Sequence, residues 1–130
     1  MVEQEIYPIT IDDTTGRAYV EVSGVVNAAK IGNTFFAVIL RQQWILGDRS
    51  IVWHVKGACV PESFSFSDIL KKAETVKNFT KPGKSAIVIE GDVLLQKRVA
   101  GFYRNLGEAI TVRQLAVFDT LDEAEKWLNA

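Results

Sequence analysis

Three nearly continuous apolar runs constrain what this chain can fold into. They are "SIVWHVK" at 50–56, "SAIVIEG" at 85–91 and "AITVRQLAVF" at 109–118. Apolar runs rich in β-branched residues are typical of strands that are covered on both faces. Because segments with helical spacing lie between these runs, the sequence predicts an α/β domain with a central sheet shielded by helices.

The amino-terminal part of the chain predicts a β-hairpin. Two short β-branched and aromatic runs, "EIYPITID" and "RAYVEVSG", are separated by "DTTG". This turn sequence suits a tight reversal in which Gly16 has a positive φ. Pro8 lies in the first run and has no N–H to donate, so an edge strand or an irregular start is expected there.

Helical spacing is predicted in three segments between the strands. The first runs from Asn27 or Asn33 to Leu46, and Gly32 makes its start ambiguous. The second is "DILKKAETVKNF" at 68–79, which the turn sequence "KPGK" at 81–84 follows. The third covers 92–106, with an apolar stripe formed by Leu94, Leu95, Val99, Phe102, Tyr103 and Leu106.

The end of the chain predicts a closing helix. Thr120 and Glu123 have the spacing of a capping box, in which each side chain bonds the amide of the other residue. The apolar residues that follow share one helical face, so the helix is expected to pack back onto the sheet. The predicted order is therefore β-β-α-β-α-β-α-β-α within a single domain, 1–130.

Composition narrows the class of protein. The 130 residues include 15 Lys and Arg against 16 Asp and Glu, and a net charge of −1 gives no overall attraction to nucleic acid. The single cysteine excludes an internal disulfide and suits a reducing compartment. The start of the chain has no basic region of a secretory signal, and the longest apolar run, "FFAVIL", is too short to span a bilayer. A cytoplasmic protein without a membrane span is expected.

Motifs for catalysis and for metal or nucleotide binding are weak. "GKS" at 83–85 lacks the earlier glycine of a P-loop and opens a predicted strand instead of a helix. His54 and Cys59 are the only residues of their types, and a closed metal site typically needs four such ligands. A Cys59–His54 nucleophile pair is an alternative that the sequence leaves open. The main prediction is a non-enzymatic protein without a metal ion or cofactor.

The stretch "PESFSFSD" at 61–68 is the most suggestive candidate site. Ser63, Ser65 and Ser67 directly precede a predicted helix, where free amides would stabilise a phosphoserine. Serine is also a preferred N-cap residue, and Ser65 or Ser67 could serve that role without any regulation. Both readings remain open at this point.

Several segments resemble the small bacterial SpoIIAA-like proteins of the STAS superfamily. The resemblance lies in "SIVWHVKGA", "SDILKKAETV", "KSAIVIEGD" and, most specifically, the ending "LAVFDTLDEAEKWL". It implies a mixed central sheet with helices packed against it and a non-enzymatic, protein-binding role. Anti-sigma-factor antagonists of this superfamily are controlled by phosphorylation of a serine in the loop after the third strand.

In this chain that loop corresponds to 57–66. The resemblance places Glu62 and Ser63 where the family has an Asp-Ser pair. The family pattern continues with Ser-Gly, whereas this chain has Phe64 and Ser65. The family usually has an acidic residue inside the preceding strand, where this chain has His54.

The sequence and the resemblance together predict a cytoplasmic regulatory domain that binds a protein partner. The predicted recognition surface is the loop at 57–67 with the adjoining helix, and its candidate residues are Glu62, Ser63, Ser65, Ser67 and His54. A homo-oligomer is left open. An alternative function is binding of a small apolar, lipid-like ligand in a pocket lined by Phe35, Phe36, Phe64, Phe66 and Phe102.

Overall fold

The computed structural model describes residues 5–61, 64, 67–69, 71, 82–109 and 113–130. Its strands are β1 (Ile9–Ile11), β2 (Ala18–Val25), β3 (Ile51–Cys59), β4 (Gly83–Ile89) and β5 (Arg113–Phe118). Its helices are α1 (Ala28–Ile39), α2 (Gln42–Leu46), α4 (Val93–Ala109) and α5 (Leu121–Leu128).

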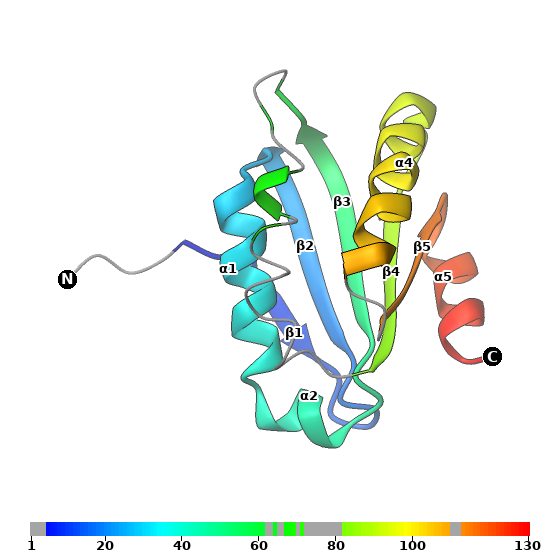
Figure 1. Cartoon of the computed structure of the whole chain (residues 1–130). Coiled ribbons are helices and arrows are strands. Elements are labelled where there is room, and N and C mark those ends of the chain that lie inside the picture. The colour runs from blue at the N-terminus through cyan, green and yellow to red at the C-terminus, as the bar shows by residue number, and fades with distance from the viewer. Residues whose placement is uncertain (1–4, 62–63, 65–66, 70, 72–81, 110–112) are drawn as a thin grey trace.

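The strands form one five-stranded sheet in the order β1-β2-β3-β4-β5 (Figure 1). β1 pairs antiparallel with β2, and β2, β3, β4 and β5 run parallel to one another. The predicted α/β architecture and the amino-terminal hairpin are therefore confirmed, and the sheet is mixed. Because successive parallel strands are neighbours, right-handed crossovers place the connecting helices on one face.

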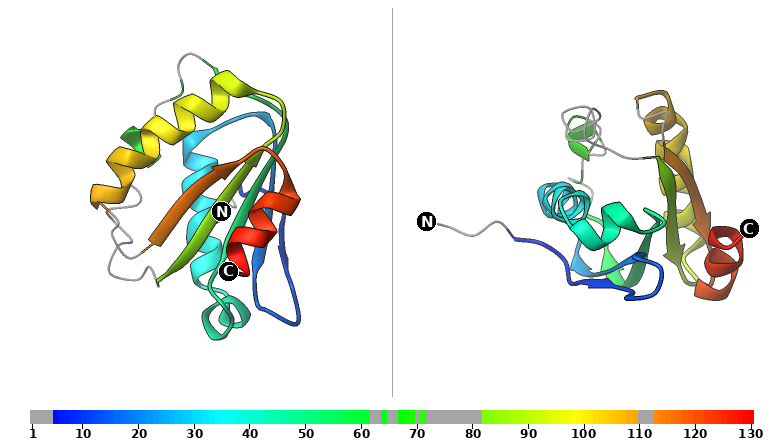
Figure 2. Two further views of the ribbon diagram at one scale, coloured as in Figure 1. Left: turned by 90° about the vertical axis from the view of Figure 1, so that its right-hand side faces the viewer. Right: turned by 90° about the horizontal axis from the view of Figure 1, so that it is seen from below.

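Alternating side chains divide the core between the two faces of the sheet. On one face Val20, Ile51 and other strand residues pack with Val38 of α1 and with Trp44 of α2. On the other face Val52, Ala86 and Val88 pack against Ala124 and Leu128 of α5. Figure 2 shows α1 and α2 on the opposite side of the sheet from α5. We call these faces the α1 face and the α5 face.

Local signals predicted several element boundaries correctly. Gly16 has φ +76°, and a Cβ there would lie 2.7 Å from the Cα atom of Gly47. Asn27 is the N-cap of α1 and accepts a hydrogen bond of 3.0 Å from the Lys30 amide, so the helix begins at the first of its two predicted starts. Pro8 directly precedes β1, which is an edge strand as expected.

The predicted closing helix is confirmed as α5. The Thr120 hydroxyl oxygen accepts a hydrogen bond of 3.2 Å from the Glu123 amide, which is the threonine half of the predicted capping box. Ala124 and Leu128 are buried against the α5 face. The helix therefore packs back onto the sheet as its apolar spacing predicted.

The first predicted helix is not continuous. α1 ends at Ile39, Arg41 is extended with φ −77° and ψ 121°, and α2 begins at Gln42. This break allows the Trp44 side chain to be fully buried, with its Nε1 donating a hydrogen bond of 3.1 Å to the Ser50 carbonyl oxygen. Burial of a large aromatic ring thus outweighs the helical propensity of the segment.

Two predicted loop boundaries are wrong. The loop was expected from Gly57, but β3 continues to Cys59 because its last residues pair with the end of β2. Gly83, predicted in a turn, begins β4, and a Cβ at this position would collide with the carbonyl oxygen of Arg49. β3 is also covered less fully than predicted, since Lys56 is exposed.

The other two predicted helices are seen to different extents. Residues 67–69 are helical, and most of the predicted helix at 68–79 lies outside the described residues. α4 confirms the third helix and extends it to Ala109, so β5 begins later than predicted, at Arg113. Within the described part of the chain, no helix has the length and apolar character needed to cross a membrane.

Candidate binding surface

A polar network fixes the last helix at the amino ends of the parallel strands. Arg17 is buried, and its guanidinium lies 3.0 Å from Asp48 Oδ2, 3.3 Å from Glu125 Oε2 and 3.0 Å from Asn129 Oδ1. The Tyr19 hydroxyl donates a hydrogen bond of 2.7 Å to Glu125 Oε1. Burial, followed by this bond to the carboxylate, raises the pKa of Tyr19. These contacts connect β2 to α5.

A second buried arginine lies at the same end of the sheet. Arg113 Nε donates a hydrogen bond of 3.0 Å to Ser85 Oγ, and Nη2 donates to the carbonyl oxygens of Arg49 and Lys84 at 2.9 Å each. Its guanidinium also lies 5.4 Å from the centre of the Trp44 ring. Burial lowers the pKa of Arg113 to about 10, so the side chain stays protonated at neutral pH.

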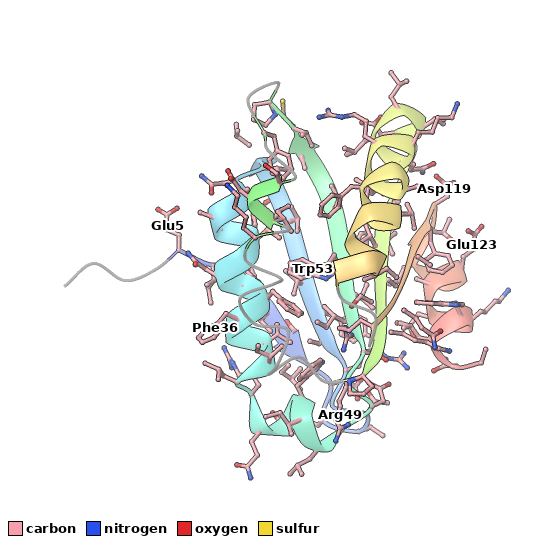
Figure 3. All side chains as sticks on the ribbon, in the orientation of Figure 1. Glu5, Phe36, Arg49, Trp53, Asp119 and Glu123 are labelled. Atoms are coloured by element: carbon pink, nitrogen blue, oxygen red, sulfur yellow. The ribbon has the colours of Figure 1, made fainter. Side chains whose placement is uncertain are left out.

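The amino ends of the strands are therefore occupied by structural contacts. Figure 3 shows Arg49 at this end of the molecule, below the sheet. In the described part of the chain, every buried side-chain nitrogen and oxygen has a hydrogen-bond partner. Groups that are fully paired within the protein have little left to offer a ligand.

The opposite end of the sheet exposes large apolar side chains. Val25 at the end of β2 is 70% exposed, and Val93 and Leu94 at the start of α4 are 57% and 76% exposed. Cys59, the last residue of β3, pairs with Val25. Figure 1 shows the ends of β2 and β3 and the start of α4 together at the top of the molecule. We call this region, with the end of β4, the carboxyl edge.

The first turn of α4 is held in place by polar contacts. Asp92 Oδ1 accepts a hydrogen bond of 3.0 Å from the Leu95 amide, which caps the helix. Asp119, directly after β5, accepts a hydrogen bond of 2.9 Å from Gln96 Nε2. Leu95 is 8% exposed, so the same turn that buries it directs Leu94 toward solvent. The exposure of Leu94 is therefore part of an ordered helix start.

A strip of charged side chains extends from the carboxyl edge along the α5 face. Glu21 of β2 pairs with His54 of β3, and His54 Nε2 lies 3.2 Å from Oε1 of Glu90, directly after β4. The His54 side chain is 17% exposed and that of Glu90 is 60% exposed. Sheets of parallel strands normally have both faces covered. The eight-residue helix α5 leaves this strip open.

The predicted serine site lies mostly outside the described residues. Glu62, Ser63 and Ser65 are not among them, whereas Ser67 is exposed at the start of a helical segment, 67–69. The chain enters this loop from Val60, directly after the carboxyl edge. His54 lies on the α5 face beside Glu90. A role of these residues in regulation stays a prediction.

The phenylalanines of the predicted apolar pocket are spread over different places. Phe35 and Phe64 are half-buried and pack against the core of the α1 face. Phe36 is 43% exposed, and Figure 3 shows it on α1, directed away from the sheet. Phe102 is half-buried on α4, and Phe66 lies outside the described residues. Two of the five thus pack against the same core, and the pocket stays a prediction.

The structure does not bring Cys59 and His54 together. Both residues lie on β3, five positions apart, which corresponds to about 16 Å along a strand. A direct hydrogen bond between them is therefore not possible while β3 is intact. Cys59 is exposed. In the described part of the chain, no three His, Cys, Asp or Glu side chains are grouped so that they could hold a metal ion.

Sequence reasoning missed the apolar residues of the carboxyl edge. Leu94 was assigned to the buried stripe together with Leu95, yet adjacent helical residues do not face the same direction. That conflict was a usable signal that one of the two leucines is exposed. Val25 had no such signal, because its exposure depends on where the neighbouring elements end.

Comparison of the chain with protein-family models, with curated proteins and with solved structures found no match in any of the three. What the carboxyl edge binds is therefore inferred from its own residues.

Proposed function

We propose that this protein is a non-enzymatic regulatory domain that binds another protein through its carboxyl edge. The observation that carries the proposal is the exposure of Val25, Val93 and Leu94, at 57–76%, at the same end of the parallel strands (Figure 1). Groups of exposed apolar side chains mark interaction sites in soluble proteins.

The position of the serine loop supports the same surface. In the SpoIIAA-like proteins that the sequence resembles, the loop after the third strand carries the regulated serine. In this chain the loop leaves β3 after Cys59, which pairs with Val25 of the carboxyl edge. A partner bound at this edge would therefore contact the loop, and a change in the charge of the loop would alter binding.

The charges near the carboxyl edge indicate the chemistry of the partner. Four exposed side chains there are acidic, and three are basic: Glu21, Glu90, Asp92 and Asp119 against Lys56, Lys97 and Arg98. Interfaces typically combine an apolar centre with a polar rim of complementary charge. The expected partner surface presents apolar side chains to Val25 and Leu94, basic side chains toward Glu90 and Asp92, and acidic side chains toward Lys97 on α4.

Two exposed leucines provide a matched test. Leu94 at the carboxyl edge is 76% exposed, and Leu46 of α2, at the opposite end of the strands, is 77% exposed. Tagged wild-type protein, Leu94→Glu and Leu46→Glu are used to recover partners from native cell extract, and the affinity of the stoichiometric partner is then measured. We expect Leu94→Glu to weaken binding about tenfold or more and Leu46→Glu to leave it unchanged.

Circular dichroism establishes that both leucine variants are folded. A partner that binds Leu94→Glu as tightly as wild type, or that is lost equally with Leu46→Glu, contradicts the proposed surface. Recovery of no stoichiometric partner contradicts the protein-binding function itself.

The regulatory part of the proposal concerns Ser63, Ser65 and Ser67. Treatment of the wild-type protein with a kinase extract is expected to change its affinity for the partner. The triple variant Ser63→Ala, Ser65→Ala, Ser67→Ala is expected to bind the partner but to show no such change. A response that persists in the triple variant would exclude these serines as the switch.

A further inference from the structure

The two edge strands of the sheet differ in how they are protected against pairing with another strand. β1 has three residues, follows Pro8, and is followed by Asp12 and Asp13. Short length, proline and nearby charge are the usual features that prevent an edge strand from pairing with a further strand. β1 therefore has the features of a protected edge.

β5 lacks these features. It has six residues, "RQLAVF", and contains no proline, glycine or charged residue after Arg113. The Arg113 side chain itself is directed inward, toward Ser85. In the described part of the chain, β5 has a strand neighbour on one side, β4. The left view of Figure 2 looks onto this edge, with α4 and α5 on either side of β5.

The burial of β5 is also incomplete. Its four apolar residues, 115–118, are all half-buried, whereas Ala86 and Val88 of the adjacent β4 are fully buried. An added strand would cover these side chains on one flank and would satisfy the outward row of backbone N–H and C=O groups. The segment that fits beside β5 is therefore another extended strand.

We propose that two copies of this chain pair through β5 in antiparallel orientation, forming one continuous sheet around a two-fold axis. In an antiparallel pair, two residues that lie opposite each other have their side chains on the same face of the sheet. For two identical strands, this is so only if the two-fold axis passes through one residue position and not between two residues. An axis at Ala116 places Leu115 of one copy opposite Val117 of the other. Gln114 then lies opposite Phe118.

A second copy would meet no charge repulsion along this edge. The nearest charged residues are Arg113 and Asp119, and the same register places them opposite each other at both ends of the pair. No like charges meet, and the apolar positions meet apolar or uncharged ones. A two-fold pair also uses the open edges of both copies at once, which leaves a closed dimer.

This dimer does not depend on the proposed partner surface. β5 is three strand positions from β2, or about 14 Å across the sheet. Val25 of both copies would therefore remain exposed in the dimer.

Lysine and glutamate at the axis test the proposal. In Ala116→Lys or Ala116→Glu, two like charges would be directly opposite each other at the two-fold axis. Sedimentation equilibrium is measured for the wild type and for each variant. The wild type is expected to be a dimer, and each variant alone is expected to show a dissociation constant about tenfold or more higher. Thr10→Lys, an exposed position on the protected edge β1, is the control and is expected to dimerise as wild type does.

A mixture of the two variants distinguishes lost pairing from misfolding. Ala116→Lys and Ala116→Glu, mixed in equal amounts at low salt, are expected to form a heterodimer because opposite charges then meet at the axis. A monomeric wild type overturns the proposal. So does a dimer that Ala116→Lys leaves intact, or a mixture of the two variants that stays monomeric.

Discussion

Arg17 and Tyr19 show how single residues hold the last helix on the sheet. Arg17 directly precedes β2 and Tyr19 is its second residue, and both contact the carboxylate of Glu125 in α5. Neither residue belongs to an apolar stripe, so sequence periodicity gave no sign of their role. Buried charged groups of this kind require partners, and their loss affects stability more than that of surface ion pairs.

Replacing Tyr19 with phenylalanine should change how stability depends on pH. Burial and the hydrogen bond to Glu125 raise the pKa of Tyr19 above its unfolded value, so the folded state favours the neutral phenol. The stabilisation is fully present below pH 10 and is lost as the pH rises through the folded pKa. We expect Tyr19→Phe to cost about 1 kcal/mol at neutral pH, and this difference to shrink above pH 10.

Urea unfolding of wild type and Tyr19→Phe between pH 8 and 11 measures this effect. A difference in unfolding free energy that stays constant over the whole range would show that the phenol proton does not contribute.

Removing the Arg17 guanidinium should destabilise the protein strongly. In Arg17→Met the carboxylates of Asp48 and Glu125 lose their cation, although each is about a third exposed and water compensates in part. We expect a loss of about 2 kcal/mol in the free energy of unfolding. Arg41→Met, at an exposed position between α1 and α2, should change it by less than about 0.5 kcal/mol. Equal effects in urea unfolding would contradict the role of the network.

At the scale of elements, local signals located helix starts better than strand and helix ends. The caps at Asn27 and Thr120 were predictable because they depend on contacts within three residues. The break at Arg41 was not, because it follows from burial of Trp44 against the loop before β3. The length of β3 was missed for a similar reason, since pairing with β2 extends it to Cys59.

Two glycine substitutions separate the effect of packing from that of helix propensity. A Cβ at Gly47 would collide with the Thr15 carbonyl oxygen, where α2 meets the hairpin turn. Gly101 is exposed in α4, and a Cβ there would meet no atom within 4 Å. We expect Gly47→Ala to cost about 2 kcal/mol or more, and Gly101→Ala to stabilise by about 0.5–1 kcal/mol. Thermal unfolding of the two variants checks this, and a stabilised Gly47→Ala would contradict the close packing.

For the whole molecule, the main asymmetry is between the two ends of the parallel strands. At the amino ends, buried Arg17 and Arg113 are paired within the protein. At the carboxyl edge, Val25 and Leu94 face solvent, and the serine loop follows the end of β3. The proposed recognition surface therefore lies at the end of the strands opposite to these two buried arginines.

The sequence located the serine loop relative to the strands, but it did not indicate which apolar residues near that loop are exposed. The loop after β3 could be placed from the strand pattern and the resemblance, because loops follow directly from element order. Exposure of Val25 could not, because an apolar strand residue is normally assigned to the core, and for Leu94 the sequence showed only that one of two adjacent leucines must be exposed. Their position depends on where α4 begins relative to β2, which is a property of the assembled fold.

Hydrogen exchange of the chain, alone and with its partner, tests the proposed recognition surface most directly. The account predicts slower amide exchange in the complex at 23–27, 57–61 and 91–96, with no change at 42–47 in α2. Slower exchange at 42–47 without any change at 91–96 would contradict it.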